Sequence, residues 1–395
     1  MTTTTADYTW PSELTELRDV VAAFRERHAG EAAVRTLAET NAPLDPRTWQ
    51  IMAEQLGLAG LTVPEELGGA AAGYEYLAVA MEELGKSLLP SPLLATTALA
   101  IGTLMQVDDA SARERLLPAL ASGQITGTLA YTGADGHWDR TQKPQVRATR
   151  HGDGWRLDGT VHHVLDGALA DLVLVVADTD EGPSVFAAEG PLPGLVRSPM
   201  TTLDGTRSQA RLDFHDVPAT AAGVLGAAAP TVEAVLTPAA VLLAAEQVGG
   251  AQYCLDTAVA YARTRTQFGR AIGSYQAIKH KCVDMYLEIE SARAAVYYAA
   301  SCLTVNSADA EPAASIAKTL ASAAFDRASA DSIQIHGGIG FTWEHPAHLY
   351  FRRAISTRAL FGDPRRHHEV VAASLLDRTT RSDASTSPPE SRRVQ

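Results

Sequence analysis

The chain has 395 residues, of which 46% are hydrophobic and 20% are charged, and its formal net charge at pH 7 is −13. This length exceeds the size at which one hydrophobic core usually keeps growing, so we expect two or three domains. The excess of acidic residues argues against nonspecific binding to nucleic acid or to an anionic membrane. Because we find neither a run of about 18 apolar residues nor an N-terminal signal pattern, we expect a soluble, cytoplasmic protein.

The three cysteines, Cys254, Cys282 and Cys302, all fall inside helical patterns. Their spacings match no common zinc signature, so no metal site is predicted. They are typical of small buried hydrophobic residues in a protein of a reducing compartment.

The first part of the chain has helical periodicity. Hydrophobic residues recur on one helix face from Leu14 to Phe24. Asp45 followed by Pro46 indicates a helix start, and Gly57 indicates the end of that helix. Similar patterns continue to about residue 120, and we therefore expect an all-helical domain over residues 1–122.

From about Gly123 the pattern changes to short β-prone segments separated by turn signals. Leu172–Ala177 is a continuous apolar run of the kind found in buried strands, and Ala210–Val217 alternates apolar and polar residues. Gly152-Asp-Gly between two such segments indicates a tight turn. These features predict a β domain over residues 123–228.

Helical patterns return after Pro230 and predict a helical bundle over residues 229–378. Apolar residues then follow each other at alternating steps of four and three, which is the spacing of a bundle seam. These residues are Ile278, Cys282, Met285, Ile289, Ala292, Val296, Ala299 and Leu303. The last segment, 379–395, is rich in Ser, Pro and Arg and is predicted to be a disordered tail.

One motif of the bundle, Tyr261-Ala-Arg-Thr-Arg-Thr-Gln-Phe-Gly269, indicates a binding site for phosphate. Arg265 is at the end of a helix, just before the helical pattern stops, so its guanidinium group could reach a phosphate outside the helix. Gln267 and Gln276 offer amide groups on either side of the turn, and Phe268 offers an aromatic face.

The second motif, Gln334-Ile-His-Gly-Gly-Ile-Gly340, closes a later helix. Gly337 and Gly338 lack side chains and would allow a ligand to approach the backbone closely. From the residue types alone, the alternative is a glycine-rich helix end and a solvated arginine. We refer to the two motifs, together with Gln276, as the clasp.

The order and spacing of the two motifs, with the connector Val63-Pro-Glu-Glu-Leu-Gly-Gly69, resemble the acyl-CoA dehydrogenase family over nearly the whole chain. The resemblance implies an α+β fold with an N-terminal helical domain, a middle β domain and a C-terminal four-helix bundle. It also implies FAD as the cofactor and α,β-dehydrogenation of an acyl-CoA thioester as the reaction.

In this family, the clasp motifs of one subunit hold the FAD that is bound mainly by its neighbour. By resemblance, Arg265, Phe268 and Gln276 would contact the pyrophosphate region, while Gln334 and Gly338 would contact the adenosine side. The candidate FAD-binding residues are therefore Arg265, Gln267, Phe268, Gln276, Gln334, Gly337 and Gly338.

The catalytic base of the family is missing from both positions where members place it. The reaction needs a carboxylate that removes the α-proton while the β-hydride moves to the flavin. Most members carry it as the glutamate of a tyrosine-glutamate-glycine motif, which corresponds here to Leu360-Phe361-Gly362. Other members carry it on the first bundle helix, at the position of Ala239.

Two motifs that lie against the flavin ring in the family are also replaced. The threonine-glutamate-proline segment corresponds to Tyr131–Trp138, and the tryptophan-isoleucine-threonine segment corresponds to His163-Val-Leu165. This pattern resembles the flavin-clasping subunit of α2β2 heterotetrameric acyl-CoA dehydrogenases, some of which oxidise steroid side-chain thioesters. The resemblance implies a paralogous partner that supplies the base and an electron-transfer flavoprotein that accepts the electrons.

Two alternatives remain open at this point. Glu246 could be a relocated base in a stand-alone homotetramer, or the chain could be a non-catalytic flavin-binding homologue. We expect Glu246 to pair with an arginine or lysine of the bundle, because buried carboxylates usually have partners. No motif identifies the acyl group.

Several further polar residues have plausible structural roles. Asp363 is expected to cap a helix that begins at Pro364, and Glu344 to be structural. We expect the basic stretch Arg365–His368 to form a solvated helix face, with contact to a CoA or FAD phosphate as the alternative. His162 and His163 are expected to be half-buried strand residues.

Overall fold

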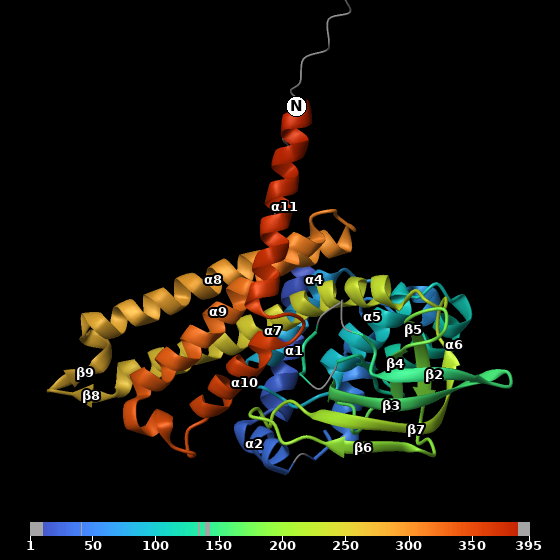
Figure 1. Ribbon diagram of the computed structural model, residues 1–395. Coiled ribbons are helices and arrows are strands. Elements are labelled where there is room, and N and C mark those ends of the chain that lie inside the picture. Colours follow the sequence, from blue (N-terminus) through green and yellow to red (C-terminus); the bar gives the residue numbers. More distant parts are fainter. Residues whose placement is uncertain (1–10, 41, 133–134, 139–142, 386–395) are drawn as a thin grey trace, which may run out of the picture.

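The computed structural model describes residues 11–40, 42–132, 135–138 and 143–385, except for the side chains of 377–385. Figure 1 shows helices and a sheet at one side of the molecule and long bundle helices at the other. The predicted α+β class, with helices before and after a β segment, is confirmed.

Asp45 begins a helix as its sequence predicts: its carboxylate accepts a hydrogen bond from the Thr48 N–H at 3.0 Å, and Pro46 occupies the first helical position. The helix ends before Gly57, whose φ is +64°. The helices of this first part are α1 (Ser12–His28), α2 (Glu31–Thr40), α3 (Pro46–Gln50), η1 (Ile51–Gln55), η2 (Leu58–Gly60), η3 (Glu65–Leu67), α4 (Tyr74–Gly85), η4 (Ala95–Ile101), α5 (Gly102–Gln106) and α6 (Ala110–Ala121).

The middle of the chain forms a seven-stranded sheet in the order β1-β4-β5-β7-β3-β2, with β6 also paired to β7. Strands β1 and β4 run parallel, and the other strand pairs among the described residues run antiparallel. The strands are β1 (Gly127–Ala130), β2 (Val146–His151), β3 (Gly154–Leu165), β4 (Leu172–Ala177), β5 (Ser184–Glu189), β6 (Leu195–Pro199) and β7 (Gln209–Ala221). The long strand β7 pairs with β3, β5 and β6 and so curls the sheet.

Strand β4 coincides with the predicted apolar run and is buried along its whole length. Its alternate residues from Leu172 to Val176 belong to a core shared with the helices. Those from Val173 to Ala177 belong to a second core inside the curled sheet, with Phe186. The sheet is therefore covered on both faces at this strand, which explains why the run does not alternate.

The C-terminal part is a helical bundle in which α7, α8 and α9 pack against one another and α10 packs on α7 and α9. The predicted seam on α8 is buried or half-buried, as expected. The elements are α7 (Ala228–Thr264), β8 (Thr266–Gln267), β9 (Arg270–Ala271), η5 (Ile272–Ser274), α8 (Gln276–Thr304), α9 (Ala310–His336), η6 (Gly337–Phe341), α10 (Ala347–Ala359) and α11 (Pro364–Ser385).

The sequence contains no run of about 18 apolar residues, and we therefore expect no membrane-spanning helix. By length and composition alone, α7 is nevertheless long and apolar enough to cross a membrane. However, 72% of its most apolar window is buried inside the protein. Helix α7 packs against α4 on one side and against α8 and α9 of the bundle, which is the position of a core helix.

The C-terminal tail differs from the prediction. Helix α11 continues to Ser385 and projects from the body of the molecule in Figure 1, so the disordered tail predicted over 379–395 is wrong for 379–385. Because adding a residue to an existing helix costs far less than starting one, a helix that begins against α9 can extend into polar sequence. Residues 386–395 lie outside the described part of the chain.

Helices α4 and α7 touch through their backbones. A Cβ atom placed on Gly249 would lie 1.9 Å from the Glu82 carbonyl oxygen, and one placed on Gly85 would lie 2.2 Å from the Glu246 carbonyl oxygen. The two glycines thus allow the first helical part to pack tightly on the bundle, directly beside Glu246.

We expect Gly249→Ala to lower the free energy of unfolding by about 1–3 kcal/mol or more, because a methyl group there must push two helices apart. In an open helix the same change would be stabilising. Urea denaturation measures the difference. Gly30→Ala is the control, since a Cβ at Gly30 would meet nothing within 4 Å, and equal stability of the two variants would contradict the argument.

Candidate functional site

The first clasp motif forms a hairpin at the end of the bundle that points away from the sheet (Figure 1). Helix α7 ends at Thr264, and the Arg265 N–H donates to the Tyr261 carbonyl at 2.8 Å. Strands β8 and β9 are joined by Phe268 and Gly269, with φ values of +51° and +80°. Two left-handed residues are the requirement of a tight two-residue hairpin turn.

Arg265, Gln267 and Gln276 are all exposed on this hairpin and at the start of α8. Phe268 is 93% exposed in a left-handed conformation, which costs a non-glycine residue roughly 1–2 kcal/mol. An exposed aromatic side chain held in a strained conformation contributes nothing to the stability of this chain. Such strain is typical of ligand-binding positions.

The second clasp motif closes α9. Gln334, Gly337 and Gly338 are exposed, and a Cβ on either glycine would meet nothing within 4 Å. Packing within the chain therefore leaves this backbone open to approach from outside. The ring of His336 lies 4.6 Å from that of Tyr261, which connects the ends of α9 and α7.

Large apolar side chains are exposed on both clasp motifs and on the loop that follows. They are Phe268 (93% exposed), Phe341 (86%), Trp343 (64%) and Ile339 (45%). Clusters of this kind mark interaction surfaces on soluble proteins. These side chains are available for a contact outside the chain, and that the clasp makes such a contact stays a prediction.

The first position predicted for the family's base is closed. Phe361 is 1% exposed, and its ring meets the ring of Trp138 edge to face, with the centroids 5.0 Å apart. The second position, Ala239, is completely buried. Neither position carries a group that could accept a proton.

The segments at the positions predicted for the base and for the family's two flavin-ring motifs contact one another. Arg366, near Phe361, donates to the Trp138 carbonyl at 2.9 Å. A Cβ on Gly136 would lie 3.0 Å from the ring of His163, which sits in a β-bulge with φ +55°. Residues 133–134 of the Tyr131–Trp138 segment lie outside the described part of the chain.

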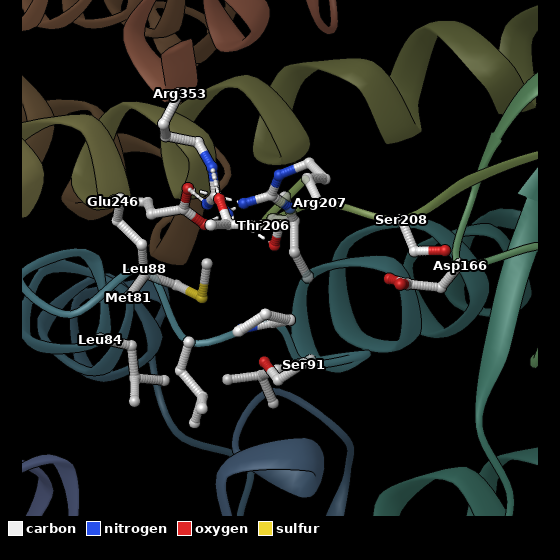
Figure 2. A pocket seen from close by; sticks show the side chains of 14 residues that line it. Met81, Leu84, Leu88, Ser91, Asp166, Thr206, Arg207, Ser208, Glu246 and Arg353 are labelled. Atoms are coloured by element: carbon white, nitrogen blue, oxygen red, sulfur yellow. Dashed lines mark hydrogen bonds and ion pairs between the residues drawn. The ribbon is translucent and has the colours of Figure 1, made fainter. Parts of the chain in front are cut away.

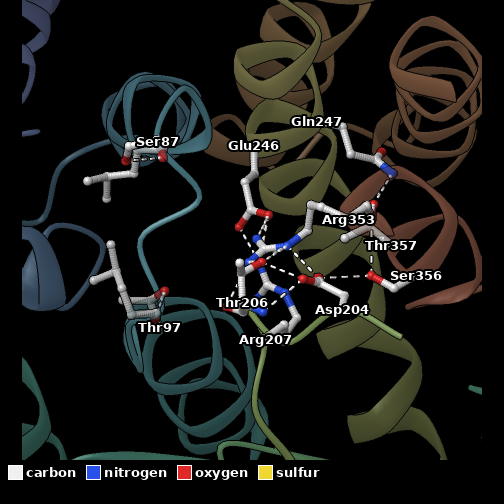
Figure 3. Close-up of polar contacts among 12 residues, drawn as sticks. Ser87, Thr97, Asp204, Thr206, Arg207, Glu246, Gln247, Arg353, Ser356 and Thr357 are labelled. Carbon is white, nitrogen blue, oxygen red and sulfur yellow. Dashed lines mark hydrogen bonds and ion pairs between the residues drawn. The ribbon is translucent and has the colours of Figure 1, made fainter. Parts of the chain in front are cut away.

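Glu246 is held by two arginines, as expected for a structural carboxylate (Figure 3). Arg207 donates to both of its oxygens, and Arg353 donates to Oε1 at 2.6 Å. Arg353 also donates to Asp204 at 2.6 Å. All four residues are buried; we call them the four-charge cluster.

The cluster sets the ionisation of Glu246. Burial alone would raise the pKa of this carboxyl group, but the adjacent charges of Arg207 and Arg353 outweigh it and hold the pKa below its usual value. The same balance, with Arg353 and a hydrogen bond from Thr206, lowers the pKa of Asp204. A carboxylate so strongly stabilised in its charged form is a poor proton acceptor.

Beside the cluster is a cavity of only about 30 Å³ between α4, α7 and the sheet (Figure 2). This is room for one or two water molecules. Its lining includes Leu84, Leu88, Asp166, Ser208 and Glu246. The Asp166 side chain is half-buried, and the burial of its carboxyl group raises the pKa to about 7, although the charges of Arg207 and Arg353 oppose this shift.

The basic stretch after Gly362 is only partly solvated, so the expectation for His367 is wrong. His367 is 5% exposed, and its Nδ1 lies 3.1 Å from the hydroxyl of Ser315 on α9. Successive residues of a helix point in different directions, which places Arg365 and His368 outward and His367 inward. Burial lowers the pKa of His367 to about 4.

Two further sequence predictions agree with the structure. The Asp363 carboxylate accepts the Arg366 N–H at 2.9 Å and so caps α11. His162 and His163 are half-buried strand residues. Glu344 is exposed, and its structural role stays a prediction.

Lys318 is a buried cation that no sequence motif identified. Its ammonium group donates to the Ser322 hydroxyl at 3.0 Å and to the carbonyl groups of Thr357 and Arg358 at 3.0 and 3.2 Å. These carbonyls belong to the last turn of α10, the negative end of that helix. Burial still lowers the pKa of Lys318 to about 7. Lys318 therefore fixes the end of α10 just before Phe361.

The lowered pKa of Lys318 predicts a pH-dependent contribution to stability. The unfolded chain binds this proton up to its ordinary pKa of about 10.5, while the folded chain releases it at about 7, so folding becomes more favourable as pH rises through this window. Urea denaturation should show the wild-type protein gaining up to several kcal/mol relative to Lys318→Met between these limits. A pH-independent difference between the two proteins would contradict the prediction.

Two family models match the chain. Residues 11–124 match acyl-CoA dehydrogenase, N-terminal domain, and residues 229–376 match acyl-CoA dehydrogenase, C-terminal domain. The chain is 36% identical over 364 residues to acyl-CoA dehydrogenase IpdE2 of Mycolicibacterium smegmatis, which covers 91% of this chain and 98% of that protein.

Solved structures show the same fold. A chain of the ChsE4-ChsE5 complex from Mycobacterium tuberculosis superposes with a TM-score of 0.81 at 26% identity, covering 97% of this chain and 100% of that one. A chain of the Tcur3481-Tcur3483 steroid ACAD has a TM-score of 0.81 at 29% identity, with coverages of 93% and 99%. The chain belongs to the acyl-CoA dehydrogenase family, whose members use FAD to oxidise the CH–CH bond of acyl-CoA thioesters.

Proposed function

We propose that this chain is the flavin-clasping, base-lacking subunit of a heteromeric acyl-CoA dehydrogenase. The site would form at the interface with a paralogous subunit, which supplies the base for the α-proton of the thioester. One observation carries the proposal: Phe361, at the position predicted for the base, is packed against Trp138, while the clasp is open at the opposite end of the bundle.

The clasp fits the dinucleotide part of FAD. Arg263, Arg265 and Arg270 are exposed and form no ion pair with any carboxylate among the described residues. Guanidinium groups suit the bidentate recognition of phosphate, and the open backbone at Gly337 and Gly338 allows close approach. When bound, FAD supplies the hydride acceptor of the reaction, while this chain's residues hold the cofactor's anionic part in place.

Among the described residues, the end of the bundle that carries Phe361, opposite the clasp, has no space for the flavin ring or for the acyl chain. Phe361, at the position predicted for the base, is buried against Trp138. The cavity beside Glu246 holds one or two waters at most, not an acyl chain. A reactive ring and an acyl group would therefore have to be accommodated mainly by the partner subunit, with this chain closing the cofactor site from outside.

Two of the similar structures are of paired chains, ChsE4-ChsE5 and Tcur3481-Tcur3483, and the second is described as a steroid ACAD. This similarity supports a paralogous partner and an acyl-CoA with a steroid-derived acyl group. By the same family relationship, the electron acceptor would be an electron-transfer flavoprotein.

A stand-alone enzyme with Glu246 as base is the main alternative. The two buried guanidinium groups on Glu246 argue against it, because both carboxylate oxygens are already occupied. A non-catalytic flavin-binding homologue would differ from the proposed subunit in that no partner would confer activity.

The chain purified alone is expected to show little dehydrogenase activity with acyl-CoA substrates. Co-expression with a neighbouring paralogue should yield an active complex with two FAD per tetramer, because only mixed interfaces join a clasp to a base. Size-exclusion chromatography with light scattering, flavin absorbance and acceptor reduction measure the three quantities. Full turnover by the lone chain would refute the proposal, and an inactive complex would favour the non-catalytic alternative.

Glu246→Gln is expected to leave the turnover rate of the complex nearly unchanged and to lower the free energy of unfolding by about 3–5 kcal/mol, the usual result of breaking a buried ion pair. The matched control is Glu344→Gln, at an exposed carboxylate, which should change neither quantity. If Glu246→Gln instead slows turnover by a factor of about 100 or more (about 2.7 kcal/mol in the barrier) without a loss of stability, Glu246 is the base.

A further inference from the structure

We propose that Arg270 is a further anchor for the phosphate groups of the flavin dinucleotide, held ready for binding by its stacking on Tyr275. The inference rests on the proposed function, since it requires FAD at the clasp. Arg270 lies on β9, the second strand of the hairpin. The earlier candidates lie on the other side of the turn, Gln267 on β8 and Arg265 just before it.

Arg270 has a defined orientation although it lies on the surface. Its guanidinium carbon lies 4.1 Å from the centroid of the Tyr275 ring, a cation–π contact. The Tyr275 hydroxyl in turn donates to the Gln267 carbonyl at 3.2 Å. The Ile272 N–H donates to the Arg265 carbonyl at 2.8 Å. The backbone segments that carry Arg265 and Arg270 are therefore hydrogen-bonded to each other in one hairpin.

The charge of Arg270 is not balanced within the chain. Among the described residues no carboxylate pairs with it, whereas the exposed Arg147 and Arg327 each pair with at least two acidic side chains. Lys279 and His280 on the first turns of α8 are exposed and likewise form no ion pair with a described carboxylate. In a chain with a net charge of −13, this end of the bundle is therefore locally positive.

An anion with several acceptor oxygens is the natural counterpart of this arrangement. A planar guanidinium group offers paired donors to phosphate oxygens. Stacking on Tyr275 leaves the edge of that group free to donate, and it removes part of the side-chain entropy that binding would otherwise cost. The unpaired charge and the fixed orientation together favour a ligand phosphate over a solvated surface arginine.

The experiment compares FAD affinity of the complex between this chain and its paralogous partner, measured by flavin fluorescence over a range of salt concentrations. Arg270→Gln is expected to weaken FAD binding about tenfold and to reduce its salt dependence, because one screened charge interaction is lost. Arg270→Lys should give an intermediate affinity. The matched control is Arg150→Gln, since Arg150 also stacks on an aromatic ring, Trp155 at 5.0 Å, but in the sheet.

Variants at Tyr275 test the stacking separately. Tyr275→Phe keeps the aromatic face and should keep most of the affinity, whereas Tyr275→Leu should approach the affinity of Arg270→Gln. Unchanged FAD affinity and salt dependence in Arg270→Gln would overturn the proposal. So would dissociation of the Arg270→Gln complex with normal FAD affinity in the intact fraction, because Arg270 would then contact the partner's protein surface. A wild-type complex without FAD would refute the proposed function itself, which is a different result.

Discussion

The four-charge cluster joins the separate parts of this protein. Arg353 comes from α10, Glu246 from α7, and Asp204 and Arg207 from the segment between β6 and β7. Two positive and two negative charges are buried together, so each loses its hydration. Such a group is tolerated only when every charge has partners with good geometry. The cluster therefore restricts how the sheet can meet the bundle, and with it the position of every surface that the two parts share.

The same cluster makes Glu246 unsuitable as a catalytic base. The Glu246 carboxylate, which lines the small cavity, is already neutralised by two guanidinium groups, and Phe361, at the position predicted for the base, packs against Trp138. An edge-to-face aromatic pair contributes about 0.5–1.5 kcal/mol beyond the burial of its apolar area. At Glu246 and Phe361 the residues thus increase stability and provide no free group for proton transfer.

Local features of the fold were predictable from the sequence because the interactions that determine them are close along the chain. The Asp45 cap involves a residue three positions away, and the buried strand β4 is visible as one apolar run. The two arginines on Glu246 are 39 and 107 residues away. A pairing with some basic residue could be expected from burial, but its identity depends on how sheet and helices meet. His367 was mispredicted for a related reason, since residue type alone does not tell which face of α11 packs on α9.

The clasp differs from the buried end of the bundle, because its residues are exposed and add little to the stability of the chain. Phe268 is strained and 93% exposed, the arginines beside it have no described acidic partners, and Gly337 and Gly338 leave the backbone uncovered. Each of these features lowers the stability of the isolated chain or leaves it unchanged. The closed end, in contrast, consists of buried and mutually satisfied groups. The exposed and unpaired groups of the clasp therefore support the proposed function, in which a second polypeptide completes the binding site there.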